Sequence, residues 1–406
     1  MGGTLFLAHR VPFPPDRGDR IRSHHLLKAL AQAGPVHVGC FGEGDANAER
    51  ALAAVAASAC VVARTKPLAL AGVEAVLSGK PVSLTAFHSR KLAAWVRETV
   101  AREEIEAIVV FSGQMGQYVP ADFAGRVVID LCDVDSAKFE SYAAAGERVW
   151  LNAREARLLA AEEERLGQRA DAAILISEAE AALYRSRLRE PGKVKVQVIG
   201  NGIDAAIFDP AAAAPHPEIA AQTGPHFVFT GQMDYRPNEQ AALWVIEELL
   251  PHLRARHAGA VFHVVGRDPT PRLRAHRGTP GVAVWGEVPD VRPFLAAADA
   301  VLAPLLIARG VQNKVLEAMA MARPVVLTLE AATGIRVDDG THWLVCPPDP
   351  AVMAARIDYL LADPDTASRI GAAARRFVIE RHAWDAMLVP LGALIAGRGE
   401  GQRHAA

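Results

Sequence analysis

The sequence predicts an α/β protein built from two doubly wound parallel-sheet domains that face each other across a cleft. At 406 residues the chain exceeds the usual size of a single core. Short β-type apolar runs alternate with longer helical patterns from end to end. A Pro- and Ala-rich stretch, 205–224, separates two such series. We therefore predict domains at 1–203 and 204–380. A C-terminal helix and frayed tail follow at 381–406, with packing back on the N-terminal domain as one option.

In the first domain, the segment 19–33 carries Ile21, Leu26 and Leu30 on one helical face and ends before Gly34. The run Thr4–Ala8 is too short for a signal peptide and indicates a first strand. The same criteria predict strands at 36–41, 107–112, 126–131, 172–177 and 194–199, and helices at 48–57, 89–102 and 144–169.

The second domain repeats this alternation. The sequence predicts strands at 227–230, 261–265, 282–285, 300–302 and 324–327, and helices at 238–250, 291–297, 313–321, 350–361 and 365–380. In sheets of this kind ligands bind at the carboxyl ends of the strands, so the loops that follow the strands are the candidate sites.

The composition argues against several classes of protein. The net charge of −2 gives no overall attraction to nucleic acid. The four cysteines are scattered, which favours free thiols in a reducing compartment over disulfides or a zinc site. No apolar run approaches the ~18–20 residues of a membrane span. We expect a cytoplasmic protein, and the sequence leaves open a peripheral contact with the inner face of the cytoplasmic membrane.

The segment 310–326 is the most informative part of the chain, because it contains a loop, a helix start and then a strand that begins with proline. The first turn of a helix offers unpaired N–H groups and a positive dipole end, which favour a phosphate. Lys314 adds a positive charge, and Glu317 can accept hydrogen bonds from two ribose hydroxyls. The pattern predicts a nucleotide-diphosphate site. The alternative is that Glu317 only caps or solvates its helix.

Three further loops follow strands of the second domain. In the loop 230–238, Gly231 allows close approach of a diphosphate and Arg236 can reach it. The loops that contain Gly266 and Val288 can offer backbone groups to a base edge. The alternative is a glycine turn with a surface arginine in the first loop, and plain connections in the other two.

The loop 10–22 holds the equivalent position in the first domain. Its prolines make it stiff, and Gly18 permits close backbone approach. Asp19, Arg20 and Arg22 surround the helix start, where the arginines can receive a phosphate or an anionic acceptor. The alternative is a solvated basic loop. No GxGxxG motif follows the first strand, which argues against an ordinary NAD-binding fold.

Asp133 and Asp135 follow the strand 126–131 and can bind hydroxyls or act as a base. A metal site is a weaker alternative. A purely structural alternative is that Asp135 or Ser136 caps the start of a helix. Other candidate bases, each more often a packed or surface histidine, are His9, His24, His25 and His88.

Together these segments resemble the GT-B-fold glycosyltransferases of the broad family 4 (group 1). The markers are the glycine loop around Gly18, Ala170-Asp171 followed by Ser177, and the segments 201–204, 229–238 and 313–320. The segments 9–23 and 133–136 are similar to those of sugar transferases associated with PEP-CTERM/exosortase exopolysaccharide loci.

This resemblance implies a UDP- or GDP-linked sugar as donor in the C-terminal domain and a glycan or lipid-linked acceptor in the N-terminal domain. It also implies retaining transfer with no metal and no cofactor. Glu317 would hold the ribose. Arg236 and Lys314 would neutralise the diphosphate, with help from the backbone of Gly310, Val311, Gln312 and Asn313. Two positions depart from the family pattern: Arg309 stands where a glutamate is usual, and Gln232 where an arginine is usual. Arg309 can compensate for both.

The sequence thus predicts a glycosyltransferase of the hexosyltransferase type, with Arg236, Lys314 and Asp133 as catalytic residues, acting in exopolysaccharide or glycan assembly. One alternative is a nucleotide-sugar 2-epimerase of the same fold. The other is a non-catalytic scaffold within a polysaccharide-assembly complex, which the missing glutamate at position 309 favours.

Overall fold

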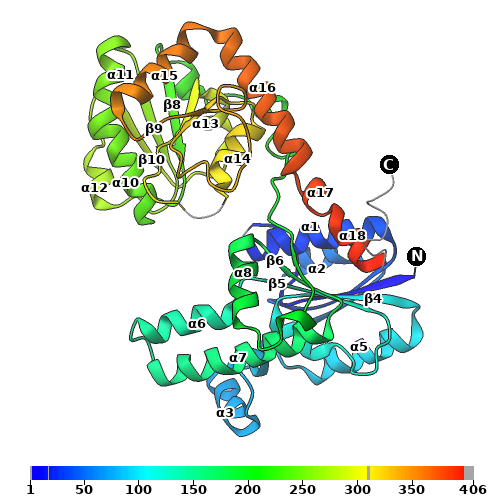
Figure 1. Cartoon of the computed structure of the whole chain (residues 1–406). Helices are drawn as coiled ribbons and strands as arrows, with labels where there is room; N and C mark the ends of the chain where they lie inside the picture. Colours follow the sequence, from blue (N-terminus) through cyan, green and yellow to red (C-terminus); the bar gives the residue numbers. More distant parts are fainter. Residues whose placement is uncertain (1, 17, 309–310, 397–406) are drawn as a thin grey trace. The chain divides into compact units, whose positions relative to one another are not determined.

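The computed structural model describes residues 2–16, 18–308 and 311–396. They form two compact units (Figure 1). The first unit runs to Asn201 and also includes the helix α18 (Val389–Ala396), and the second unit is Gly202–Ala386. The chain therefore enters the second unit two residues earlier than the sequence indicates.

The first unit is built on a seven-stranded parallel sheet in the order β3-β2-β1-β4-β5-β6-β7. Its central strands are buried and rich in Val and Ile, as strands covered on both faces must be. The strands are β1 (Gly3–Ala8), β2 (Val36–Gly42), β3 (Ser58–Ala63), β4 (Ile105–Phe111), β5 (Arg126–Cys132), β6 (Ala172–Leu175) and β7 (Val196–Val198).

Helices flank both faces of this sheet (Figure 1). They are α1 (Gly18–Ala33), α2 (Ala46–Ala53), α3 (Leu68–Ser78), α4 (Val82–Ala86), α5 (Arg90–Arg102), α6 (Asp135–Ala144), α7 (Val149–Arg169) and α8 (Glu178–Arg187), with short 3₁₀ turns at Gly113–Tyr118 and Pro191–Lys193. The C-terminal helix α18 packs on α1, β4 and β5. Arg126 Nε donates to the carbonyl of Leu394 at 3.0 Å.

One prediction for the first unit was wrong, and one of its strands was not predicted. The helix predicted at 144–169 begins at Val149, and a separate helix, α6, precedes it. Gly146 and Arg148 take left-handed φ values of 83° and 37°, which end one helix and redirect the chain. The pattern also gave no signal for β3, which is an edge strand with only one buried residue.

The second unit has a six-stranded parallel sheet in the order β10-β9-β8-β11-β12-β13. The strands are β8 (His226–Thr230), β9 (Val261–Val265), β10 (Val282–Gly286), β11 (Ala300–Ala303), β12 (Val325–Leu327) and β13 (Leu344–Val345). In both sheets the strand order reverses beside the first strand of the unit, so the doubly wound architecture is confirmed.

The helices of the second unit lie on both faces of its sheet (Figure 1). They are α9 (Pro217–Ala220), α10 (Arg236–Trp244), a π-helical segment (Val245–Leu249), α11 (Leu250–Arg256), α12 (Pro271–Ala275), α13 (Arg292–Ala297), α14 (Asn313–Ala320), α15 (Pro350–Ala362), α16 (Pro364–Arg381) and α17 (Trp384–Met387, at the junction). The stretch 205–224 belongs to this unit, and its Ile219 is fully buried.

Candidate functional site

A cavity of about 620 Å³ opens in the second unit, where β8, β9 and β10 end and α14 begins. Seven of the predicted site residues line it: Gly231, Gly266, Val288, Val311, Asn313, Lys314 and Glu317. Seven others that were not assigned individually also line it: Thr230, Gln232, Asn238, Val265, Arg267, Glu287 and Val291. Most of these lie within the predicted loops, so their position after a strand was the available signal.

The two glycines let the backbones of two loops meet at the floor of the cavity. A Cβ at Gly266 would lie 1.7 Å from the carbonyl oxygen of Gly231, so no side chain fits there. A Cβ at Gly231 would lie 3.0 Å from Lys314 Nζ. Both glycine positions therefore depend on the absence of a side chain, and Gly231 leaves room for the lysine.

Lys314 is held by two groups from the same unit. Its Nζ donates to Asn238 Oδ1 and lies 4.3 Å from the centre of the Phe229 ring. Asn238 is in turn oriented by donating from Nδ2 to the carbonyl of Gln232 at 2.8 Å. Burial lowers the pKa of Lys314 to about 8, although the nearby carboxylate of Glu317 opposes this shift. The ammonium is thus preorganised and poorly solvated, which strengthens its attraction for an anion.

Glu317 lies one turn further along α14 and lines the same cavity. Burial raises the pKa of its carboxyl group to about 7, and Lys314 opposes that shift. Lys314 and Glu317 therefore perturb each other inside one pocket, which is a frequent property of functional sites.

The amino end of α14 contributes to the same cavity. The helix begins at Asn313, and within the described part of the chain the side chain of Gln312 does not cap it. The N–H groups of Val315 and Leu316 donate to the carbonyl of Gln312, so the earlier N–H groups of the turn are the ones that a ligand can use, and the helix dipole favours an anion there. The hydroxyl of Thr230 is also buried beside the cavity and has no hydrogen-bond partner among the described residues. Both features suit a ligand with several acceptor oxygens.

Two other predicted donor-site residues, Arg236 and Gln312, do not line this cavity. Arg236 is exposed at the start of α10 and does not line it. Arg267 does line the cavity, and its guanidinium donates to Gln232 Oε1 at 2.7 Å. The sequence did not single out Arg267 as a cationic group. Arg309 and Gly310 lie outside the described residues.

In the first unit, the predicted acids lie at the carboxyl edge of the sheet. Asp133 follows β5, Asp135 begins α6, and both line a small hollow beside Gln114. Burial raises the pKa of both carboxyl groups. The negative charge of Glu180 raises the pKa of Asp133 further. At Asp135 the positive charge of Lys138, and to a smaller extent His9, opposes the rise in pKa.

Backbone strain marks the same edge. Ser112 directly follows β4 and has a φ of 77°. Cys132 is the last residue of the neighbouring strand β5 and has a φ of 64°. Such conformations in residues other than glycine are often kept for function. His9 follows β1, stacks on Phe111 and pairs with Asp19 at 3.2 Å.

The structure changes the interpretation of the loop 10–22. Arg22 is buried and its guanidinium is occupied by Asp130, by the carbonyls of Ile199 and Gly200, and by Asn201 Oδ1. The prediction that Arg22 meets a phosphate or an acceptor is therefore corrected, because no donor of this side chain faces solvent. Arg20 pairs with Asp16 and Glu43. Gly18 begins α1, with no atom within 4 Å of an added Cβ.

Among the described residues, no group of three or more His, Cys, Asp or Glu side chains is arranged to hold a metal ion. In the same part of the chain, no helix is both long and apolar enough to cross a membrane.

Residues 224–363, which include the whole cavity, match the family described as glycosyl transferases group 1. A glycogen synthase of Mycobacterium tuberculosis is 29% identical over 229 residues, which are 52% of this chain and 51% of that protein. The chain thus spans about half the length of the curated relatives it matches. The residues that match the family model all lie within the second unit.

Solved structures match both units. A sucrose-phosphate synthase from Thermosynechococcus elongatus matches 98% of this chain and 99% of its own at a TM-score of 0.60 and 18% identity. The HepE protein of Anabaena, solved in complex with UDP-glucose, matches 98% of this chain and 100% of its own at a TM-score of 0.57 and 16% identity. The chain has the GT-B fold. At these identities the likeness establishes the fold alone.

Proposed function

We propose that this protein is a glycosyltransferase that moves a sugar from a nucleoside-diphosphate donor to a hydroxyl acceptor. The observation that carries the proposal is the meeting of Lys314, Glu317 and the amino end of α14 in one cavity. The group 1 match over the same residues supports it, as do the complexes of HepE with UDP and with UDP-glucose.

In the proposed reaction the second unit binds the donor. The diphosphate lies between Lys314 and the first turn of α14, and the ribose hydroxyls donate to Glu317. As the bond from the sugar to the β-phosphate breaks, negative charge develops on the leaving diphosphate. Lys314 and the helix amides stabilise that charge without reorganisation, because Asn238 and Phe229 already hold the ammonium in place.

The finer parts of the proposal come from the family resemblance. We propose that the transfer retains the anomeric configuration of the sugar and needs neither a metal ion nor a cofactor. The proposed donor is a UDP- or GDP-linked sugar, and the proposed acceptor is a glycan or a lipid-linked molecule. The N-terminal similarity to PEP-CTERM/exosortase-associated transferases supports a role in exopolysaccharide assembly. Asp133 and Asp135, both with raised pKa values, are the acceptor-side candidates of the first unit.

A thermal-shift series of UDP-, GDP- and ADP-sugars tests the donor site, because a ligand that binds the native state raises Tm. We expect one nucleotide class to raise Tm and Lys314→Ala to abolish that shift. If no nucleotide diphosphate or nucleotide sugar shifts Tm, the donor assignment fails and a non-catalytic scaffold becomes the better interpretation.

The bound donor then separates the two enzyme classes. A transferase consumes nucleotide sugar only slowly without an acceptor and releases nucleoside diphosphate. A 2-epimerase changes the sugar at C2 with no acceptor. Proton NMR of the anomeric signals during incubation with the donor distinguishes these outcomes.

A further inference from the structure

Helix α3 of the first unit presents apolar side chains to solvent. Five of its residues, Leu68, Leu70, Val73, Val76 and Leu77, are between 50% and 83% exposed. Positions 70, 73 and 77 follow helical spacing and form one continuous apolar stripe. The helix has a single charged residue, Glu74, whose carboxylate is turned to Lys66 at 2.7 Å. The apolar stripe itself therefore carries no charge.

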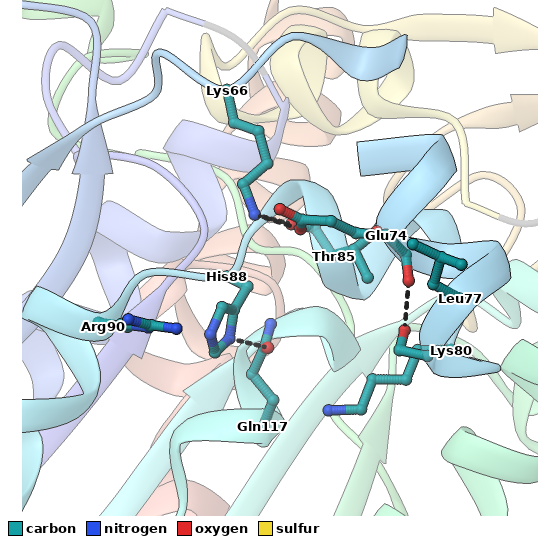
Figure 2. A pocket seen from close by; sticks show the side chains of 9 residues that line it. Lys66, Glu74, Leu77, Lys80, Thr85, His88, Arg90 and Gln117 are labelled. Atoms are coloured by element: carbon teal, nitrogen blue, oxygen red, sulfur yellow. Dashed lines mark hydrogen bonds and ion pairs between the residues drawn. The ribbon is translucent and has the colours of Figure 1, made fainter. Parts of the chain in front are cut away.

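Basic side chains lie directly beside this stripe. A hollow of about 630 Å³ is lined by Lys66, Lys80, His88 and Arg90, together with Leu77 from the stripe. Figure 2 shows these residues around the hollow, with Lys66 bonded to Glu74 and His88 bonded to Gln117. Lys80 and Arg90 have no carboxylate partner among the described residues, so their charges are available to an external anion.

An aromatic side chain extends the same surface. Arg154 of α7 donates to the carbonyls of Ala75 and Lys80, which joins the start of α7 to the end of α3. One turn earlier on α7, Trp150 is 71% exposed. An apolar helical stripe, flanking lysine and arginine, and an exposed tryptophan are the combination found in helices that lie in a lipid interface.

We propose that α3 and the basic hollow beside it dock this protein on an anionic lipid surface. The stripe enters the interface between headgroups and acyl chains, and Lys80 and Arg90 meet lipid phosphates. Charge favours this partner over a protein, because unpaired lysine is depleted from protein interfaces but enriched beside interfacial helices. The inference does not depend on the proposed glycosyl transfer.

Flotation of the full chain with vesicles tests the proposal. We expect binding to vesicles that contain phosphatidylglycerol and much weaker binding to phosphatidylcholine alone. Leu77→Glu is expected to weaken binding by more than about tenfold, because it removes buried apolar area and adds a negative charge. Lys80→Glu is expected to weaken it by about fivefold or more.

Two matched variants serve as controls. Val352→Glu makes the same type of change at an exposed valine of α15, and Lys28→Glu makes the same charge change on α1. Both are expected to bind like the unmodified chain. Equal losses in Lys28→Glu and Lys80→Glu would overturn the proposal, since binding would then depend on overall charge and not on this surface.

The same variants separate lipid from other occupants. The circular dichroism spectrum and the Tm of the free protein are expected to be unchanged in Leu77→Glu, which excludes a folding defect. If the unmodified chain self-associates in sedimentation velocity and Leu77→Glu is monomeric, a second copy occupies the stripe and the lipid proposal is wrong. Absence of flotation with phosphatidylglycerol vesicles would also overturn it.

Discussion

Arg22 and Asp130 form a buried ion pair inside the first unit, with 2.8 Å between the guanidinium Nη2 and the carboxylate Oδ2. Their side chains are 2% and 0% exposed, and Arg22 also donates to the carbonyls of Ile199 and Gly200. The pair thus joins α1, β5 and the end of the first unit, which makes Arg22 a structural residue.

Removal of Arg22 tests this role. We expect Arg22→Ala to lower the free energy of unfolding by about 3–5 kcal/mol, because Asp130 is then left as an unpaired buried charge. Urea denaturation followed by circular dichroism measures the change. Arg165→Ala breaks an exposed pair with Glu162 and is expected to cost about 1 kcal/mol or less. A fully stable Arg22→Ala protein with impaired acceptor binding would restore the site interpretation.

The second prediction concerns turnover. We expect Lys314→Ala to lower kcat by ~10²–10³ because it removes the preorganised cation next to the leaving diphosphate. Steady-state kinetics with the donor identified by thermal shift measures this. Arg236→Ala tests the other predicted cation, for which the same loss is expected if the side chain reaches the bound donor. Unchanged kcat in both variants would contradict the proposed charge stabilisation.

The third prediction follows from the close approach of two loops. In Gly266→Ala the new Cβ would meet the carbonyl of Gly231 at 1.7 Å, so the two loops must separate. We expect a loss of about 1–3 kcal/mol in stability, and a matching loss of donor affinity measured by calorimetry. Gly192→Ala has open space around the added methyl group and is the control. Wild-type affinity in Gly266→Ala would show that this contact does not shape the donor site.

The fourth prediction is a pH dependence of donor affinity. The pKa of Lys314 is lowered to about 8, so above that pH the ammonium loses the proton that attracts the diphosphate. The pKa of Glu317 is raised to about 7, so below that pH its carboxylate is lost as a ribose acceptor. We expect the highest affinity between about 7 and 8.

Calorimetry with an intact nucleotide sugar is suited to this measurement, because its diphosphate does not titrate near neutrality. Lys314→Met should remove the alkaline decline and keep the acidic one, whereas Glu317→Gln should do the reverse. The free energy of unfolding of the ligand-free protein has the opposite pH dependence. The contribution of Glu317 to it decreases as the pH rises towards 7, and the contribution of Lys314 is lost as the pH falls through 8. A flat affinity profile would contradict both assignments.

Much of the cavity in the second unit was predictable, because its parts are local in sequence. A glycine directly after a strand, or a lysine in the first turn of a helix, marks its position without knowledge of the fold. Gly231, Gly266, Lys314 and Glu317 were found in this way, and all four line one cavity. Asn238 was not assigned, since its role depends on meeting Lys314, 76 positions away.

The local sequence pattern gave a wrong prediction where two residues of the same type have different surroundings in the fold. Arg20 and Arg22 are both basic residues at one helix start, yet Arg22 is buried against a carboxylate 108 positions away. The helix predicted at 144–169 was too long, because its start depended on the left-handed conformations of Gly146 and Arg148.

By itself the sequence determined the α/β alternation, the doubly wound sheets and the position of Lys314 in the first turn of a helix that follows a loop. These depend on periodicity and helix polarity, which neighbouring residues encode. Only the tertiary structure decided that Arg22 is structural, that Asn238 positions Lys314, and that the apolar face of α3 is left uncovered in the first unit. Burial and pairing arise between distant segments, so no local pattern carries them.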